Sequence, residues 1–223
     1  ISRKQMIRKT LKRVQEATVC VELPKTDQHG MPSPTGTGFF VSPDGWFITA
    51  AHVVTEDGTP NGKPREDFGK WWLQKERSFK GPGAMCQFMA LEQVIARHDV
   101  ALIKVDFQKN ANKMWLENRN SFPYIQVSVR GLEMGEPVYS FGYPLSTSSA
   151  NKVDGGGVVG TTQLSPRVTS AIVASELEMD GSLMTSGHYP HVMIPSLYGV
   201  VSSLANVEIV ELFHRLGIEV SDE

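Results

Sequence analysis

Residues 36–52 combine two short apolar runs with a tight turn, and this pattern constrains the fold more than any other in the chain. The runs 37–42 and 46–49 flank a Pro-Asp-Gly sequence at 43–45, which is typical of a turn between two antiparallel strands. Similar β-type runs recur along the chain and are separated by Gly, Pro, Asn and Asp. Many short strands with few helices predict an all-β barrel or sandwich.

The other expected strands share a short length and flanking turn residues. They cover residues 19–23, 71–73, 86–95, 100–105, 137–141, 157–162, 167–175 and 189–194. Loops are expected at 25–34 and 55–70, which are rich in Gly, Pro and polar or charged residues. The polar segment 109–120 is expected to connect two halves, and the Ser- and Gly-rich segment 146–157 is expected to be mobile.

Helical periodicity is confined to the two ends of the chain. Residues 1–17 carry six basic side chains, while Ile7, Leu11 and Val14 share one apolar stripe. This segment is either a short amphipathic helix docked on the domain or a basic arm for a partner or an anionic surface. Near the other end, Asn206 and Gly217 are the expected caps of a second helix with a crowded apolar side.

Charge and cysteine content narrow the class of function. The formal net charge of −2 gives no electrostatic case for nucleic-acid binding, and no window approaches the roughly 18 apolar residues of a membrane helix. Two cysteines, Cys20 and Cys86, cannot form a dense disulfide framework, and we expect buried or free thiols rather than a single bridge. This cysteine usage favours a reducing compartment and therefore a cytoplasmic location.

Two residues are candidates for proton-transfer chemistry. A serine nucleophile needs a base at neutral pH, and a histidine base needs a carboxylate that fixes its tautomer. His52 follows an apolar strand through two alanines and is the best base among six histidines. Asp99 opens a strongly apolar strand and is the best orienting carboxylate, whereas His98 is expected to be a surface neighbour. Taken alone, His52 could be a packed histidine and Asp99 a strand-end residue.

Several segments, in this order along the chain, resemble the trypsin-like serine proteases, and more closely their HtrA-like branch. They are Gly36-Thr37-Gly38-Phe39 with Asp44-Gly45, Thr49-Ala50-Ala51-His52, Asp99-Val100-Ala101-Leu102-Ile103-Lys104-Val105, the strand within 135–144 and the strand at 168–175. The resemblance covers most of residues 17–215. It implies that His52 is the general base and acid, that Asp99 orients it, and that neither a metal nor a cofactor is required.

The resemblance also implies a fold of two six-stranded antiparallel β-barrels with the site in the cleft between them. The first barrel would span residues 17–120 and carry His52 and Asp99. The second would span residues 121–223 and include the C-terminal helix, while residues 1–16 would form the short basic helix at the N-terminus.

The family's nucleophile, a serine in a Gly-Asn-Ser-Gly-Gly-Pro turn, has no counterpart in the 223 residues. The three glycines at 155–157 contain no serine, and Ser182 and Ser186 lack the second glycine. The serine pair at 202–203 lies in an apolar run, and Cys86 lacks the glycine context of a cysteine nucleophile. Each of these residues has a simpler explanation as part of a turn or strand.

The position of this gap is informative. Residues 191–194 resemble the strand that leads to the serine loop, but residues 195–205 already resemble the family's last strand. A closed barrel cannot easily lose an interior strand, because two unpaired edges would remain. We therefore expect the encoded protein to contain about thirty further residues, with the serine, between Ile194 and Pro195.

Two functions follow from these observations. The first is a serine endopeptidase that cleaves polypeptides through an acyl-enzyme and that is activated when a partner or substrate orders the serine loop. The alternative is a catalytically inactive protease-like scaffold that acts as a binding or regulatory module.

Overall fold

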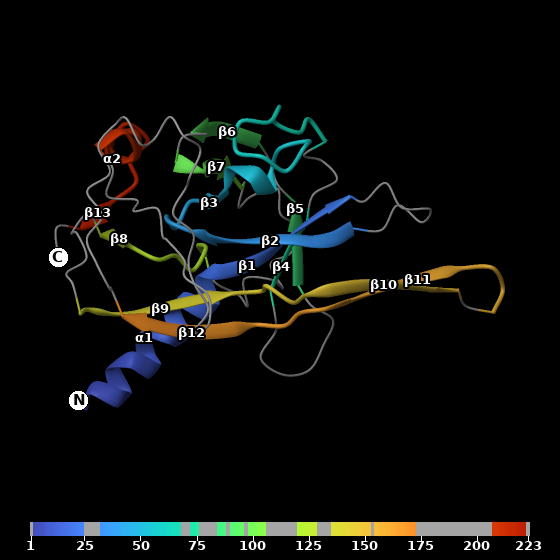
Figure 1. Cartoon of the computed structure of the whole chain (residues 1–223), viewed down its shortest axis with the longest axis horizontal. Coiled ribbons are helices and arrows are strands. Elements are labelled where there is room, and N and C mark those ends of the chain that lie inside the picture. The colour runs from blue at the N-terminus through green and yellow to red at the C-terminus, as the bar shows by residue number, and fades with distance from the viewer. Residues whose placement is uncertain are drawn as a thin grey trace.

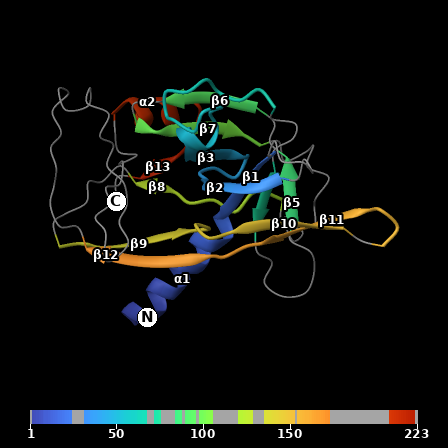
Figure 2. The same cartoon turned by 45° about the vertical axis from the view of Figure 1, so that its right-hand side comes forward.

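Short antiparallel strands dominate the chain, as the turn-rich sequence predicts (Figures 1 and 2). The computed structural model describes residues 2–24, 32–67, 72–75, 84–87, 90–95, 98–105, 120–128, 135–152, 154–172 and 207–221. The helical elements are α1 (Arg3–Ala17), the 3₁₀ turn η1 (Ala51–Val53) and α2 (Val207–Arg215). The strands are β1 (Thr18–Pro24), β2 (Pro32–Phe40), β3 (Trp46–Ala50), β4 (Trp72–Lys75), β5 (Ala84–Gln87), β6 (Ala90–Ile95), β7 (Val100–Lys104), β8 (Val127–Ser128), β9 (Pro137–Gly142), β10 (Thr147–Lys152), β11 (Val158–Gln163), β12 (Arg167–Ile172) and β13 (Val220–Ser221).

The first half forms one antiparallel sheet of seven strands in the order β5-β4-β1-β2-β3-β7-β6. In a flat sheet its edges would lie about 29 Å apart, because neighbouring strands are about 4.8 Å apart. The edge strands β5 and β6 are joined between Gln87 and Ala90, a reach of about 11 Å at most. The sheet must therefore curl strongly. The pairings do not close it, so the predicted six-stranded barrel is not shown, and two strands replace the single strand predicted at 86–95.

The concave side of this sheet encloses the main hydrophobic core. Alternate residues of β1, namely Val19, Val21 and Leu23, are buried there with Phe40 and Phe47. The ring of Phe40 meets Phe47 edge-on at 5.1 Å and stacks on Phe122 at 4.4 Å. The strand predicted at 19–23 is thus confirmed as part of β1, and its other face is buried too, since Thr18, Cys20 and Glu22 are at most 2% exposed.

The second half contains two smaller antiparallel pairs. Strand β9 pairs with β12, and β10 pairs with β11, so that the four strands form one long ribbon in Figure 1. A second six-stranded barrel is not seen in the part of the chain that the structure describes. Residues 173–206 lie outside that part, and with them the predicted strand 189–194, the candidate serines and the junction between Ile194 and Pro195.

Two sequence predictions on loops are wrong. Residues 147–152, which we expected to be mobile, form β10 and pair with β11 from Thr147↔Gln163 to Lys152↔Val158. Thr147 and Ser149 are exposed, so this strand carries no buried apolar face to reveal it. Residues 32–34, expected in a loop, belong to β2. Here β2 extends beyond the end of β3 and pairs only with β1, so Pro32 and Pro34 lie on a free strand edge, where proline is tolerated.

The C-terminal helix α2 covers the outer side of β3, β6 and β7. Ile209, Leu212 and Phe213 are buried against residues of these strands, and they form a second apolar cluster. The helix ends as the sequence predicts, since Gly217 adopts a positive φ of 69°. The Gly217 N–H donates to the carbonyl of His214, and the Ile218 N–H donates to that of Phe213.

The two cysteines do not form a bridge. Cys20 on β1 pairs with Gln74 on β4, and Leu73 on β4 pairs with Cys86 on β5, so the cysteines lie two strands apart. Two strand spacings are about 10 Å, and disulfides need Cα atoms within about 7 Å. Cys20 is a free, buried thiol, as expected, and burial and the nearby charge of Glu22 raise its pKa to about 12.

Candidate active site

His52 and Asp99 are brought together by the pairing of β3 with β7. His52 lies in η1, directly after β3, and Asp99 directly precedes β7. The two strands are antiparallel with Ala50 opposite Val100, so the end of one strand meets the start of the other. Most residues of both strands are buried, so this junction is a rigid support for the two side chains.

Asp99 binds the 51–52 segment through three hydrogen bonds. Its Oδ2 lies 2.7 Å from Nδ1 of His52, and its Oδ1 accepts the backbone N–H of His52 at 2.9 Å. Its carbonyl oxygen accepts the N–H of Ala51 at 3.0 Å. Asp99 has a φ of 52°, the left-handed region that aspartate tolerates better than most residues. The backbone and both carboxylate oxygens therefore fix the position and ring orientation of His52.

The exposure of the two side chains differs in the way a proton-transfer pair requires. The Asp99 side chain is only 14% exposed, whereas that of His52 is 44% exposed. Because Nδ1 faces the carboxylate, Nε2 remains to exchange a proton with a bound reactant. The hydrogen bond to Asp99 raises the pKa of His52 above its usual 6.5. Burial lowers this pKa, but the negative charge of Asp99 adds to the rise.

The turn that carries His52 is held by a threonine that sequence reasoning missed. Thr55 is buried, and its hydroxyl lies 2.7 Å from the carbonyl of Thr59 and 3.3 Å from that of His52. This hydroxyl ties η1 to the loop after it. The loop predicted at 55–70 is confirmed over residues 56–67, which are exposed or half-buried, and residues 68–70 lie outside the described part of the chain. No pattern in the sequence distinguishes Thr55 from other threonines, because its role depends on the local fold.

Two glycines allow β2 to pack closely against the elements around His52. A Cβ atom on Gly36 would lie 2.5 Å from a methyl of Val53, within η1. A Cβ on Gly38 would lie 2.3 Å from the ring of Phe47 and 2.5 Å from the carbonyl of Ile48. The Gly-Thr-Gly-Phe motif therefore has a steric reason.

The turn at 43–45 also needs its glycine. Gly45 has a φ of 104°, and a Cβ there would lie 2.0 Å from the carbonyl of Val105. The Asp44 carboxylate accepts a hydrogen bond from the Ser42 hydroxyl and pairs with Lys104 at 2.6 Å, which holds the turn against β7. The predicted hairpin of residues 37–49 is thus confirmed, with β2 paired to β3.

His98 differs from the prediction. It was expected at the surface, but it is 7% exposed, and its Nε2 lies 3.5 Å from a carboxylate oxygen of Glu208 on α2. Packing of α2 over β7 covers it, and this contact between distant segments leaves no mark in the local sequence.

Among residues 154–157, Gly155 and Gly156 form a turn with positive φ, in agreement with their expected role.

The described residues contain no group of His, Cys, Asp and Glu side chains arranged to hold a metal ion. Their helices include none long and apolar enough to cross a membrane.

Comparison of the sequence with known proteins identifies the family of the chain. The family model described as a trypsin-like peptidase domain matches residues 36–189, a span that includes His52 and Asp99. The chain belongs to the trypsin-like peptidase family. Membership of this family supports a protease function, and the mostly β fold with two helices agrees with it.

The structural comparison is more distant. The structure matches 112 chains of solved structures, and one of them comes from the crystal structure of Deg5. That chain shares 14% identity and a TM-score of 0.48, over 91% of this peptidase chain and 73% of its own length. This likeness is too distant to support an argument about activity. No curated protein matches the chain in sequence.

Proposed function

We propose that the protein is a serine endopeptidase of the HtrA-like branch that cleaves polypeptides through an acyl-enzyme. The observation that carries the proposal is the 2.7 Å contact between His52 Nδ1 and Asp99 Oδ2, reinforced by the second oxygen of Asp99 on the His52 backbone. Family membership supports the reaction class, and the motifs within 36–52, 99–105, 135–144 and 168–175 favour the HtrA-like branch.

In the proposed mechanism, His52 acts first as a base and then as an acid. Its Nε2 accepts the proton of a serine hydroxyl as that oxygen attacks the peptide carbonyl. The imidazolium that forms is stabilised by the carboxylate of Asp99, and it then donates the proton to the leaving amine. Water, activated by the same nitrogen, hydrolyses the acyl-enzyme. No step requires a metal or a cofactor.

The nucleophile is assigned to a segment that the 223 residues do not contain. We place this segment, of about thirty residues, between Ile194 and Pro195, where the family's serine turn and following strand are expected. The proposal includes two six-stranded barrels, at 17–120 and 121–223.

Regulation and location are part of the same proposal. A partner protein or the polypeptide substrate orders the serine loop and so activates the enzyme, a known type of switch. The two cysteines, one of them a buried free thiol, favour the cytoplasm.

One observation favours a second function. The 223 residues hold no Gly-Xaa-Ser-Gly-Gly turn, so a protein encoded without such a turn would be an inactive scaffold for binding or regulation. On that alternative, the His52–Asp99 pair has no catalytic role.

Reaction with a fluorophosphonate probe distinguishes the two functions. The endopeptidase is expected to become labelled, and the variant His52→Ala to lose the label, because the serine then lacks its base. The matched control is His214→Ala, which removes an exposed histidine on α2 and should label like the parent protein. Absence of labelling in the parent would favour the scaffold, and full labelling of His52→Ala would refute the role of His52.

A further inference from the structure

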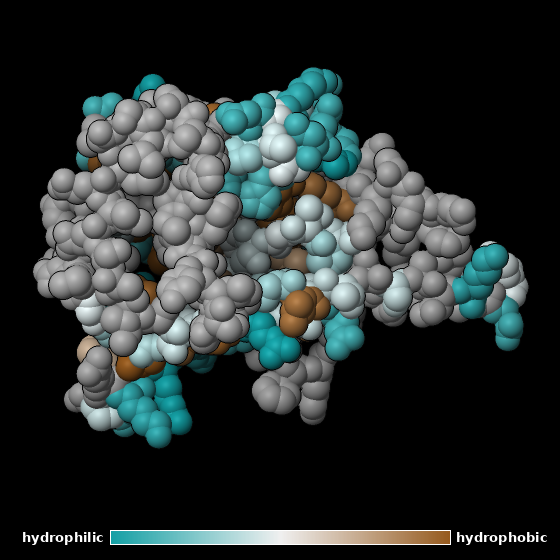
Figure 3. All heavy atoms as spheres, viewed as in Figure 1, coloured by the Kyte–Doolittle hydropathy of each residue, from teal (hydrophilic) through white to brown (hydrophobic). Residues whose placement is uncertain are grey.

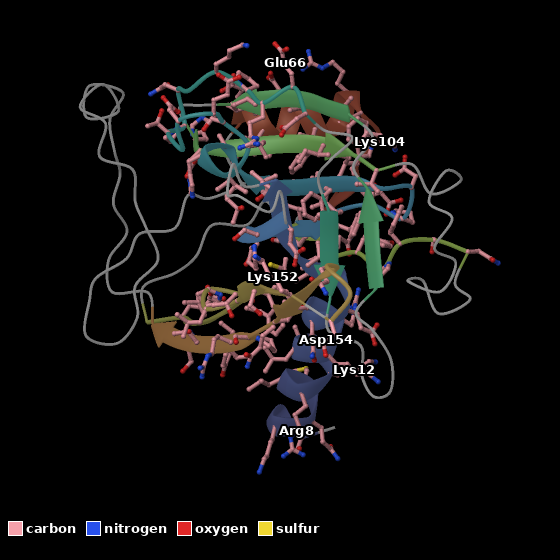
Figure 4. The ribbon with its side chains drawn as sticks, turned by 90° about the vertical axis from the view of Figure 1, so that its right-hand side faces the viewer. Arg8, Lys12, Glu66, Lys104, Lys152 and Asp154 are labelled. Atoms are coloured by element: carbon pink, nitrogen blue, oxygen red, sulfur yellow. The ribbon has the colours of Figure 1, made fainter. Side chains whose placement is uncertain are left out.

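The basic helix α1 projects from the body of the molecule (Figure 1), with most of its cations facing solvent. Lys4, Arg8, Lys9, Lys12 and Arg13 are all exposed, and among the described residues none of them pairs with a carboxylate. Figures 1 and 4, which view the molecule from directions 90° apart, both show the start of α1 beyond the body, and Figure 4 labels Arg8 and Lys12 on it. Figure 3 shows hydrophilic side chains gathered over the same end.

The cations form one continuous band on the helix. Lys4, Arg8 and Lys12 recur every fourth residue and so lie in one row, and Lys9 and Arg13 form a second row beside it. We call these five residues the basic band. A capping box between Ser2 and Gln5 stabilises the start of the helix, with contacts of 3.0 and 3.3 Å. The helix is therefore ordered where the band begins.

The charge of the chain is divided sharply between this helix and the rest. With six basic residues and one acidic residue, α1 carries +5, so that the remainder carries −7 of the total −2. A negatively charged surface attracts the cationic helix α1 and repels the acidic remainder of the chain, so the protein would bind such a surface through α1. The net charge of the whole chain conceals this division.

The apolar side of α1 adds a second requirement on the partner. Ile7, Leu11 and Val14 are only partly buried, and Met6 is 60% exposed beside Lys9. Phosphates of a nucleic acid gain nothing from exposed aliphatic side chains, and a long polyanion would also run along the acidic body. A bilayer offers both anionic headgroups and an apolar layer, and it touches only the projecting helix.

We infer that the basic band of α1 docks the protein on an anionic lipid surface. This role goes beyond the proposed protease activity and is independent of it. The cations contact the headgroups, and Met6 enters the boundary between headgroups and acyl chains.

Vesicle binding tests this inference. The protein is mixed with phosphatidylcholine vesicles that contain about 30 mol% phosphatidylserine, or none, and the bound fraction is measured by sedimentation. Binding is expected only to the anionic vesicles and is expected to disappear when NaCl rises from about 0.1 M to about 0.5 M. Equal binding to both vesicles, or no binding to either, would overturn the inference.

Paired variants locate the contact. Arg8→Gln with Lys12→Gln should lower the partition coefficient about 25-fold, since each cation near an anionic membrane contributes about fivefold. The control, Lys152→Gln with Arg215→Gln, removes two exposed cations elsewhere and should change it less than about twofold. An equal loss in both pairs would refute the role of the basic band in vesicle binding.

Arg8→Lys keeps the charge and should bind like the parent protein. Circular dichroism of each variant shows whether its helix content is unchanged.

A DNA duplex at the same phosphate concentration provides the competing arm. Weaker binding to the duplex than to the anionic vesicles is expected, because only the bilayer accepts Met6 and spares the acidic body. Tighter binding to the duplex would replace the lipid by a nucleic acid and overturn the inference.

Discussion

Asp99 combines a left-handed backbone with three hydrogen bonds to the segment that carries His52. Its φ of 52° costs free energy in most residues, but it aims both carboxylate oxygens at one neighbour. The side chain, 14% exposed, meets a histidine that is 44% exposed. At the scale of single residues, the site is therefore defined by how Asp99 is held as much as by its charge.

Replacing the carboxylate by an amide tests this point. Asp99→Asn keeps the size and the tolerance of a positive φ, but it removes the charge and presents the wrong tautomer partner. The pKa of His52, followed by NMR, is expected to fall, and peptidase activity is expected to fall on the order of 10⁴-fold. Asp44→Asn, in the turn at the other end of β3, should change neither. An unchanged His52 pKa in Asp99→Asn would contradict the hydrogen bond.

The pH dependence follows from the raised pKa of His52. Catalysis needs neutral imidazole, so kcat/KM should rise with pH through a midpoint above 6.5, and the midpoint should move down in Asp99→Asn.

The contribution of His52 to the free energy of unfolding changes with pH in the opposite direction. A pKa raised on folding stabilises the fold fully below 6.5, and this contribution is lost as pH rises through the folded pKa. Urea unfolding of both proteins across this range measures it, and equal pH dependence would count against the pair.

At the scale of elements, close packing of β2 on β3 sets the support beneath the site. Gly38 lies where β2 crosses Phe47 and pairs with Thr49. Thr49 in turn donates from its hydroxyl to the carbonyl of Thr37 at 2.9 Å. Strand β3, which leads to His52, is thus fixed on one side by β2 and on the other by β7.

A methyl group at Gly38 should separate these strands. Gly38→Ala is expected to lower the free energy of unfolding by about 1–3 kcal/mol, because the clash involves a backbone carbonyl as well as the Phe47 ring. The control is Thr35→Ala, which changes an exposed residue of the same strand and should stay within about 0.5 kcal/mol. Urea denaturation compares the two, and a smaller loss for Gly38→Ala would refute the steric explanation.

Helix α2 supports the site from the outside of β3 and β7. Phe213→Ala removes a ring that is 1% exposed and is expected to destabilise the fold by about 3–5 kcal/mol. Glu211→Ala changes an exposed residue of the same helix and should stay within about 0.5 kcal/mol. Thermal unfolding of both variants provides the measurement. Similar values for the two would mean that α2 does not pack as described.

Local patterns in the sequence predicted the elements that bury an apolar face or require a special turn. The alternation along β1, the turn at Gly45 and the cap at Gly217 are of this kind. The resemblance of the motifs around His52 and Asp99 to the trypsin-like family implied that these residues would meet, which they do. Strand β10 escaped prediction because it has no buried apolar pattern, and the burial of His98 escaped because α2, over one hundred residues away, provides it.

At the scale of the whole molecule, the two halves are joined by apolar and by polar contacts. Helix α2 and Phe122 of the second half pack on apolar residues of the first, and Tyr143 adds polar contacts to β1 and β2. The backbone N–H of Tyr143 donates to the hydroxyl of Thr37 at 2.9 Å, and the Tyr143 hydroxyl reaches the carbonyl of Thr18 at 3.5 Å. The first half provides His52 and Asp99. On our account, the second half provides the nucleophile from a segment between Ile194 and Pro195.

Peptide mapping of the fluorophosphonate adduct tests this account most directly. The protein purified from its native source is labelled and digested, and the modified residue is identified by mass spectrometry. We expect a single labelled serine, in a Gly-Xaa-Ser-Gly turn inserted between Ile194 and Pro195, with an intact mass above 24.6 kDa. An unlabelled protein of 24.6 kDa would contradict the account, and His52 would then be a base without a nucleophile.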